Sequence, residues 1–220
     1  FDEALALVGE LIHTRSEAQG GDHPRVLAMR NSRAVFYLQA QRFAEAEEEL
    51  RAILPDNRRV FGDGALNTVS VMSNLAGSLR QQGKIDEAGP YYREVAERMV
   101  ERFGPTYLRA LQTRYNHANW LRDSGALHEA LVEHRDVTAR LGEVLGDEHV
   151  MLGEMLTGYG ATARLLGAYE EAETALLRAL EIRMSGLGPT HSRTEMTREG
   201  LRSLYEAWGR PEAAAGIGVP

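Results

Sequence analysis

Apolar residues recur along this chain at the three-to-four-residue spacing of an amphipathic helix. One clear run consists of Val69, Met72, Leu75, Ala76 and Leu79. Gly83 ends that run, as a glycine in a left-handed conformation does after a helix. A second run begins near Ile85 and stops at Phe103-Gly104-Pro105. The pattern predicts two helices joined by a tight turn, and since alternation of period two is absent, almost no strand.

This pair of helices repeats at a fixed step of 42 residues, which alanines mark at Ala46, Ala88, Ala130 and Ala172. The same step reaches back to Ala4 and forward to Ala214. A second column, 16 residues after each alanine, consists of Gly20, Gly62, Gly104, Gly146 and Gly188. A fixed period of this length is typical of a repeat array.

Two further columns describe how the helices of a pair meet. Five residues before each alanine the chain has Gly83, Gly125, Gly167 or Gly209, with Gln41 as the exception. Small residues at Ala34, Ala76, Ala118 and Gly160 form another column. We interpret these small residues as the points where the two helices of a unit approach closely, while larger apolar residues fill the surrounding space.

The predicted fold class is all-α, a right-handed α-solenoid of antiparallel helix pairs that forms a single array over residues 1–220. The predicted units are 24–61, 66–103, 108–145 and 150–187. A lone second helix at 1–19 precedes them, and a final helix at about 192–208 and a tail at 209–220 follow.

The turns within the units resemble those of the tetratricopeptide repeat. The segments Gly83–Ala88, Gly125–Ala130 and Gly167–Ala172 match that family's turn of glycine, an aromatic or aliphatic residue two positions later, and alanine after two more residues. The usual repeat has about 34 residues. The longer period and the connectors at 20–24 and 187–191 resemble the kinesin-light-chain-like subclass. The resemblance implies the solenoid fold and the binding of protein partners.

The first helix begins in the middle of a repeat, because Phe1 falls in the phase of Phe43, the first residue of a second helix. We therefore expect the chain to be part of a longer polypeptide with other domains upstream. We also expect this helix to expose an apolar stripe that supports a homodimer, formed by Ala4, Leu5, Val8, Leu11 and Ile12.

Composition narrows the function classes. The net charge is −7 and no block of lysine or arginine occurs, which argues against direct nucleic-acid binding. No signal peptide and no apolar run of about 20 residues are visible, so we expect no membrane span in this segment and a cytoplasmic location. The absence of cysteine excludes disulfides and thiolate metal sites.

Candidate chemistry is sparse. His23, His149 and His191 occupy one column, and we interpret them as polar residues at helix starts, because neighbouring repeats lie too far apart to share a metal ion. His128 and His134 are six residues apart, which does not fit the zinc-protease helix.

The segment 158–160, Gly-Tyr-Gly, is interpreted as a point of close packing inside a helix. The acidic run Glu45, Glu47, Glu48 and Glu49 is interpreted as a solvated helix face. We predict no catalytic residue, no metal site and no cofactor, and therefore no enzyme.

By the family resemblance, the first helices of the units line a concave groove that binds a peptide or partner protein. The groove residues that we select are Asn31, Ser73, Arg80, Gln112, Tyr115, Asn116, Asn119, Arg122, Thr157 and Arg164. Arg80, Arg122 and Arg164 form one column, and the fork of an arginine suits carboxylates, so the peptide is expected to be acidic. The alternative is that these arginines pair with nearby acids such as Asp86 or Asp123.

The leading function is a non-catalytic protein-interaction scaffold. The alternative is a sensor or regulatory module of a larger bacterial signalling protein, either a serine/threonine kinase or a transcriptional regulator. An enzyme with its active site in the helical array has no supporting residues.

The alanine column leads to a first prediction. Ala130→Leu should overpack the seam between helices and lower the free energy of unfolding by roughly 1–3 kcal/mol. Urea unfolding measures the change, and an unaltered midpoint would remove Ala130 from the seam.

Overall fold

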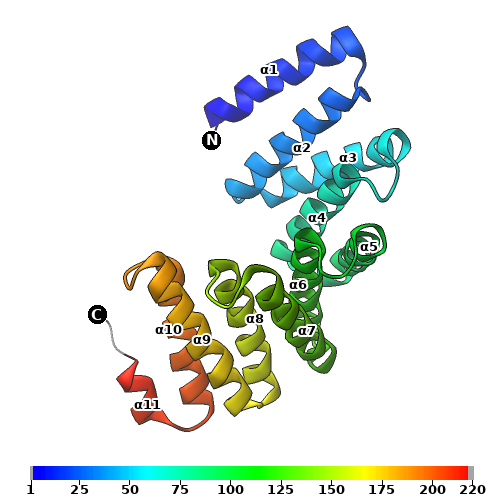
Figure 1. The fold of residues 1–220 in the computed structure, drawn as a ribbon. Coiled ribbons are helices and arrows are strands. Elements are labelled where there is room, and N and C mark those ends of the chain that lie inside the picture. The colour runs from blue at the N-terminus through cyan, green and yellow to red at the C-terminus, as the bar shows by residue number, and fades with distance from the viewer. Residues whose placement is uncertain (1, 218–220) are drawn as a thin grey trace. The chain divides into compact units, whose positions relative to one another are not determined.

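The computed structural model describes residues 2–217, and among them it contains helices and connecting turns but no strand (Figure 1). The helices are α1 (Asp2–Gln19), α2 (Pro24–Gln39), α3 (Phe43–Phe61), α4 (Leu66–Gln81), α5 (Ile85–Phe103), α6 (Leu108–Asp123), α7 (Leu127–Leu145), α8 (Val150–Leu166), α9 (Tyr169–Leu187), α10 (Ser192–Ala207) and α11 (Pro211–Gly216).

The chain divides into two compact units, Phe1–Pro105 and Thr106–Pro220. In the first unit each helix from α1 to α5 packs on the next, and in the second unit the same holds from α6 to α11. A second helix such as α3 therefore lies between its own first helix, α2, and the first helix of the next pair, α4. The predicted fold class, an all-α solenoid of antiparallel helix pairs, is confirmed.

Glycine ends the second helices because no other residue adopts the required backbone. Gly62 has φ 87° and ψ 158° after α3, and Gly104 has φ 87° and ψ 161° after α5. This region of backbone space is open almost only to glycine. Gly146 and Gly188 have the same conformation after α7 and α9, so the chain makes the same connection after each of these helices.

The alanine column lies in a buried seam between helices. Ala46, Ala88, Ala130 and Ala172 are all fully buried, as are Ala34, Ala76 and Ala118 on the first helices. At Gly160 the seam is tighter still, because an added Cβ would lie 2.6 Å from Cγ of Leu176 on α9. A Cβ on Gly158 would overlap the side chain of Tyr115. The interpretation of residues 158–160 as a close-packing point is therefore correct.

The acidic run in α3 is only partly solvated, so its interpretation as a solvated face is wrong for two residues. Glu49 is buried, and its carboxylate is bound by Arg30 and Arg33 from α2. Glu47 accepts hydrogen bonds from Nζ of Lys84 at 2.7 Å and Nε of Arg51 at 2.9 Å. Burial alone would raise the pKa of Glu47, but these hydrogen bonds together outweigh burial and lower the pKa to about 2. The spacing of the acids in the sequence does not show that Arg30 and Arg33 from α2, or Lys84 from the turn before α5, reach them.

The same ionic seam recurs 84 residues later, between α6 and α7. Arg114 lies 3.3 Å from the Glu133 carboxylate, and His117 Nδ1 lies 2.6 Å from the same group. In the intervening pair, the positions of Arg30, Arg33 and Glu49 are taken by Met72, Leu75 and Tyr91. The seams within pairs thus alternate between ionic and apolar along the chain.

The region expected to be a tail contains structure. Residues Pro211–Gly216 form the short helix α11, which packs on α10. Trp208, just before it, stacks on Tyr169 with ring centroids 5.6 Å apart. The expectation of a tail over 209–220 therefore needs correction for the segment 211–216, while residues 218–220 lie outside the described part of the chain.

Gln41 provides a test of the turn between first and second helices. It occupies the glycine column with φ 59°, a left-handed conformation that costs a residue with a side chain roughly 1–2 kcal/mol. Gln41→Gly should raise the free energy of unfolding by about 1 kcal/mol, after the greater flexibility of glycine in the unfolded chain is subtracted.

The matched control is Gly83→Ala, at φ 75° with no atom near the added methyl group. It should lower the free energy of unfolding by about 1 kcal/mol, since only the backbone is strained. Equal stability of Gln41→Gly and the parent chain in urea would contradict the assignment of strain to residue 41.

Candidate functional site

All ten residues of the predicted site lie on first helices. In the first unit Asn31 comes from α2, and Ser73 and Arg80 come from α4. In the second unit Thr157 and Arg164 come from α8, and the remaining five lie on α6, namely Gln112, Tyr115, Asn116, Asn119 and Arg122. The two groups are described separately below.

In the first unit, an amide links two successive first helices. Asn74 Nδ2 donates to Asn31 Oδ1 at 3.1 Å, and Asn31 Nδ2 donates to Ser70 Oγ at 3.4 Å. The hydroxyl of Ser73 donates to the carbonyl of Val69 in its own helix at 2.8 Å. All four side chains are at least partly accessible. Arg80, further along α4, is half-buried and already has an interaction partner.

In the second unit, Tyr115 makes the corresponding link between first helices. Its hydroxyl donates to the carbonyl of Glu154 on α8 at 3.2 Å, and its ring lies in the space left by Gly158. Burial raises the pKa of Tyr115, so its phenol remains a donor at neutral pH. Tyr115 stands two periods after Asn31, and these two members of the column each join neighbouring first helices. The other two members, Ser73 and Thr157, bond to their own helices.

Arg122 is held by groups of its own helix. Its Nη1 donates to Oδ1 of the buried Asn119 at 3.0 Å, and its Nε donates to the Asp123 carboxylate at 3.0 Å. The alternative interpretation of the arginine column, pairing with a neighbouring acid, therefore holds for Arg122.

The remaining predicted residues differ in how far they are engaged. Thr157 donates to the carbonyl of Gly153 at 2.8 Å, and Gln112 Nε2 lies 3.8 Å from Sδ of Met151. Asn116 is exposed. Arg164 is half-buried and, within residues 2–217, has no ion pair with an acidic side chain. Of the two predicted arginines in the second unit, Arg122 and Arg164, Arg164 is thus the better placed to accept a carboxylate from outside the chain.

A buried arginine on the second helix α9, which the sequence analysis did not select, binds the first helix α10 of the next pair. Arg183 on α9 is buried, and its Nη1 donates to the carbonyl of Arg193 at 2.6 Å and to Thr197 Oγ1 at 2.7 Å. Burial lowers the pKa of Arg183. Its position in the repeat is taken by Met99 and Leu141 in the two preceding pairs, so an arginine in an apolar column was the signal available in the sequence.

His134 on α7 is the second missed residue. It is fully buried, and neither ring nitrogen has a hydrogen-bond partner. Its ring meets that of Tyr115 edge-on, with centroids 5.2 Å apart. Burial, together with the nearby charge of Arg122, lowers its pKa to about 3. His134 also stands in an apolar column, where Tyr92 and Leu176 occupy the equivalent positions.

The histidine column has a structural role at helix starts. Nδ1 of His23, His149 and His191 accepts a hydrogen bond from the backbone N–H two residues later, at 3.2, 3.2 and 3.1 Å. These side chains therefore cap α2, α8 and α10. Their interpretation as polar helix-start residues is confirmed. Within residues 2–217 no cluster of histidine and acidic residues is suited to a metal ion.

None of the helices in the described part of the chain is both long and apolar enough to span a bilayer.

Comparison with known proteins identifies one family. A family model described as tetratricopeptide repeat matches residues 25–88, 67–143 and 151–217. A search of curated proteins finds no match.

Two solved structures illustrate the likeness of the fold. The structure titled "Crystal structure of Podosopora anserina putative kinesin light chain nearly identical TPR-like repeats" is 19% identical with a TM-score of 0.76, and the alignment covers 89% of this chain and 92% of that one. The crystal structure of BtubC (BKLC) from P. vanneervenii is 15% identical with a TM-score of 0.80, covering 98% of this chain and 87% of that one.

The burial of His134 predicts a pH-dependent stability. The unfolded chain binds a proton at this side chain near pH 6.5, whereas the folded chain does so only near pH 3. Above pH 6.5 His134 is neutral in both the folded and the unfolded chain, so its burial does not make stability depend on pH. Below pH 6.5 the unfolded chain takes up the proton first, and the free energy of unfolding should fall by about 1.4 kcal/mol for each pH unit.

Urea unfolding between pH 7 and pH 5 measures this slope. His134→Leu should flatten it relative to the parent chain, whereas His128→Leu, at an exposed position of the same helix, should leave it unchanged. Parallel pH profiles for the parent chain and His134→Leu would show that His134 is not buried as a neutral group.

Proposed function

Since the chain belongs to the tetratricopeptide repeat family, we propose that it is a protein-interaction scaffold whose first helices bind an extended acidic segment of a partner protein. Tetratricopeptide repeats are in general scaffolds for protein–protein interaction, and stacked repeats present long surfaces to their partners. The binding face and the chemistry of the partner are the parts of this proposal that are specific to the chain.

The observation that carries the proposal is the state of Arg164. It lies on a first helix, is half-buried and has no ion pair within residues 2–217, although the chain as a whole has an excess of acidic residues. In the second unit, two second-helix arginines are engaged by acids: Arg140 lies 2.9 Å from Asp136, and Arg178 lies 2.6 Å from both Glu148 and Glu181. A guanidinium left over among so many acids is suited to a carboxylate that arrives with the partner.

The polar groups of the first helices support an extended peptide as the ligand. In the first unit the Asn31 and Asn74 amides are linked and partly accessible. An amide offers both a donor and an acceptor, which a peptide backbone needs. In the second unit Asn116 is exposed on α6 and provides the same pair of groups. Within the second unit, Asn116 would hold the backbone and Arg164 would select an acidic side chain.

The negative net charge of the chain opposes long-range electrostatic attraction of an acidic partner. An acidic partner is repelled by the net charge of −7 and held by local arginine contacts, so its binding depends on close fit. The narrower expectation, that the array regulates a larger bacterial signalling protein, stays a prediction.

A displayed library of random peptides tests this proposal. The parent chain should enrich peptides that contain aspartate or glutamate, and Arg164→Gln should bind the enriched peptides about 10–100-fold more weakly, the effect of losing a charge-assisted hydrogen bond. Fluorescence anisotropy of a labelled peptide measures the affinity.

The matched control is Arg140→Gln, which removes an arginine from the second helix α7. It should bind the peptides as the parent chain does. Enrichment without acidic residues, or equal affinity for the parent chain and Arg164→Gln, would contradict the proposal. Thermal unfolding of both variants checks that neither change disturbs the fold.

A further inference from the structure

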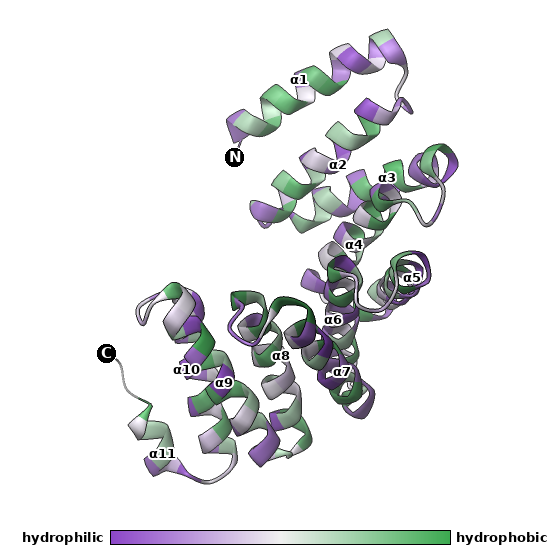
Figure 2. Ribbon diagram, viewed as in Figure 1, coloured by the Kyte–Doolittle hydropathy of each residue, from purple (hydrophilic) through white to green (hydrophobic). Residues whose placement is uncertain are grey.

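The repeat explains the uncovered apolar face of α1 (Figure 2). Leu5 and Ile12 face α2 and are 8% and 6% exposed, so the expectation that both are open to solvent is wrong. Leu7 and Leu11, on the other side of the helix, are 57% and 52% exposed. One period later Leu7 corresponds to Glu49, which is bound by arginines of α2, the first helix of the same pair. The open side of α1 is thus the side that a first helix covers in the next pair, and the expected homodimer stays a prediction.

Arg183 on α9, in contrast, departs from the repeat without an opposite charge beside it. The two preceding pairs have Met99 and Leu141 at this position, and both are fully buried. Arg183 is 4% exposed, and within residues 2–217 no acidic side chain forms an ion pair with it. Its Nε is buried without a hydrogen-bond partner, and its Nη1 donates only to neutral oxygens, the Arg193 carbonyl and the Thr197 hydroxyl. A buried charge without an opposite charge is costly, so this arrangement suits a negatively charged ligand.

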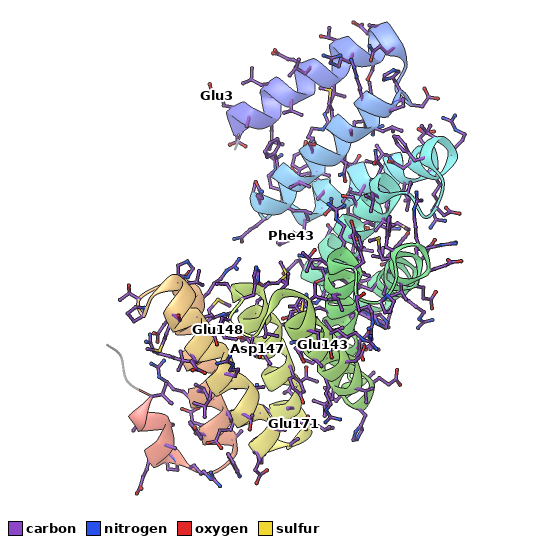
Figure 3. The ribbon with its side chains drawn as sticks, viewed as in Figure 1. Glu3, Phe43, Glu143, Asp147, Glu148 and Glu171 are labelled. Atoms are coloured by element: carbon purple, nitrogen blue, oxygen red, sulfur yellow. The ribbon has the colours of Figure 1, made fainter. Side chains whose placement is uncertain are left out.

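The acids around this arginine are held by other cations. Burial lowers the pKa of Arg183, and the charge of Glu154 on α8 opposes that effect without forming an ion pair. The Glu154 carboxylate instead lies 3.1 Å from Nη1 of Arg193. Glu148, labelled in Figure 3 and placed just before α8, lies 2.6 Å from Arg178. These neighbours therefore do not supply a carboxylate for Arg183.

The guanidinium of Arg183 reaches between the first helices α8 and α10. A Cβ added to Gly153 of α8 would lie 3.3 Å from Cγ of Arg183, so the side chain passes beside that glycine. Its end bonds to Arg193 and Thr197 in the first two turns of α10. The side chain of Arg193 is exposed on the same helix. Only the guanidinium approaches the first helices, so the backbone amides of α9 stay out of contact with a ligand on their face.

We propose that a carboxylate of the partner segment binds between α8 and α10, where it pairs with Arg183 and Arg193. This site rests on the proposed function, because the acidic segment supplies its ligand. Arg193 shares Glu154 at the surface, so it can accept a second carboxylate without leaving a buried group unpaired. The planar forks of two arginines suit the two oxygens of one carboxylate. The bound carboxylate gives Arg183 the opposite charge that its neighbours lack.

The second unit then offers two carboxylate sites along α8. Gly153, beside Arg183, and Arg164 are eleven residues apart on this helix, which places them about 16 Å apart along its axis. An extended peptide advances about 3.3 Å per residue. The partner segment should therefore carry two acidic residues about five positions apart. Except for Glu154, α8 has no charged residue between these points, so the intervening positions of the peptide need no charge.

Acetate tests the new site without a partner. The whole chain is unfolded by urea at pH 7 in sodium acetate and in sodium chloride of equal ionic strength. An anion that binds only the folded chain raises the midpoint as its concentration rises. The rise from chloride to acetate should be larger for the parent chain than for Arg183→Met, which introduces the residue that Met99 provides at this position of the repeat.

Two further variants separate binding from folding. Arg193→Gln changes an exposed side chain, so it should reduce the acetate effect while it leaves the fold intact. Arg178→Gln, on the same helix but held by Glu148 and Glu181, should respond to acetate as the parent chain does. An acetate effect of equal size in the parent chain, Arg183→Met and Arg193→Gln would overturn the proposal.

Peptides enriched by the parent chain test whether two arginines bind two different acids. Each acidic residue of a bound peptide is replaced in turn by its amide, and fluorescence anisotropy measures the affinity. Arg183→Met should weaken binding of the unaltered peptide about 10–100-fold, and it should have no further effect once the acid that binds there is an amide. Arg164→Gln should show the same pattern with the other acid.

The two arginines fail in different ways. Peptides whose binding depends on Arg164, but in which no acid depends on Arg183, would overturn the site between α8 and α10 and leave the proposed function standing. Equal affinity for the parent chain and Arg164→Gln contradicts the role of Arg164 in the proposed function, whereas a loss confined to Arg183→Met still supports the site between α8 and α10.

Discussion

The close approach of neighbouring helices at the alanine column is the constraint on which the remainder of the structure depends. Ala46, Ala88, Ala130 and Ala172 have no exposed surface, and the second helices α3, α7 and α9 each pack against two first helices. Larger side chains at these positions would separate the helices and open voids around the leucines. The glycines that end the second helices fix the length of each pair, because their backbone conformation excludes other residues. Together the two columns explain why the period stays at 42 residues.

Away from that column the chain varies the chemistry of its seams. Glu49 with two arginines and Glu133 with Arg114 and His117 form ionic seams, whereas Met72, Leu75 and Tyr91 form an apolar one in between. A buried ion pair is held by its geometry, and loss of one partner costs far more than exchange of the whole set for apolar residues. The alternation therefore matches each first helix to the second helix of its own pair. It favours the native pairing of helices over a pairing shifted by one repeat.

Features with a repeating local signal could be predicted from the sequence. Helix ends followed the glycines, the histidine column was correctly assigned to helix starts, and Gly158 and Gly160 were recognised as packing points. Features that depend on the reach of a long side chain across a seam could not be predicted. Nothing near Glu49 in the sequence shows that Arg30 and Arg33 converge on it. Likewise the burial of His134 and Arg183 depends on the helices that cover them, and their only sequence signal is a polar residue in an apolar column.

In the candidate site, too, the positions of residues on helices could be predicted from the repeat, whereas their contacts with other side chains could not. The repeat correctly placed Asn31 and Tyr115 on first helices, but it could not show that both join one first helix to the next. Nor could spacing distinguish Arg122, which is held by Asn119 and Asp123, from Arg164, which has no such partners among residues 2–217. Within the second unit, the first helices thus combine groups that fix the helices with arginines such as Arg164 that have no ion pair among residues 2–217.

Backbone chemical-shift mapping by NMR tests most directly whether the first helices are the binding face. The isotope-labelled chain is titrated with an acidic peptide selected by the chain itself. The predicted result is that the shifted amides concentrate on α6 and α8, around Asn116 and Arg164, with α7 and α9 unaffected. Shifts that concentrate on α7 and α9 instead would contradict the assignment of the binding face.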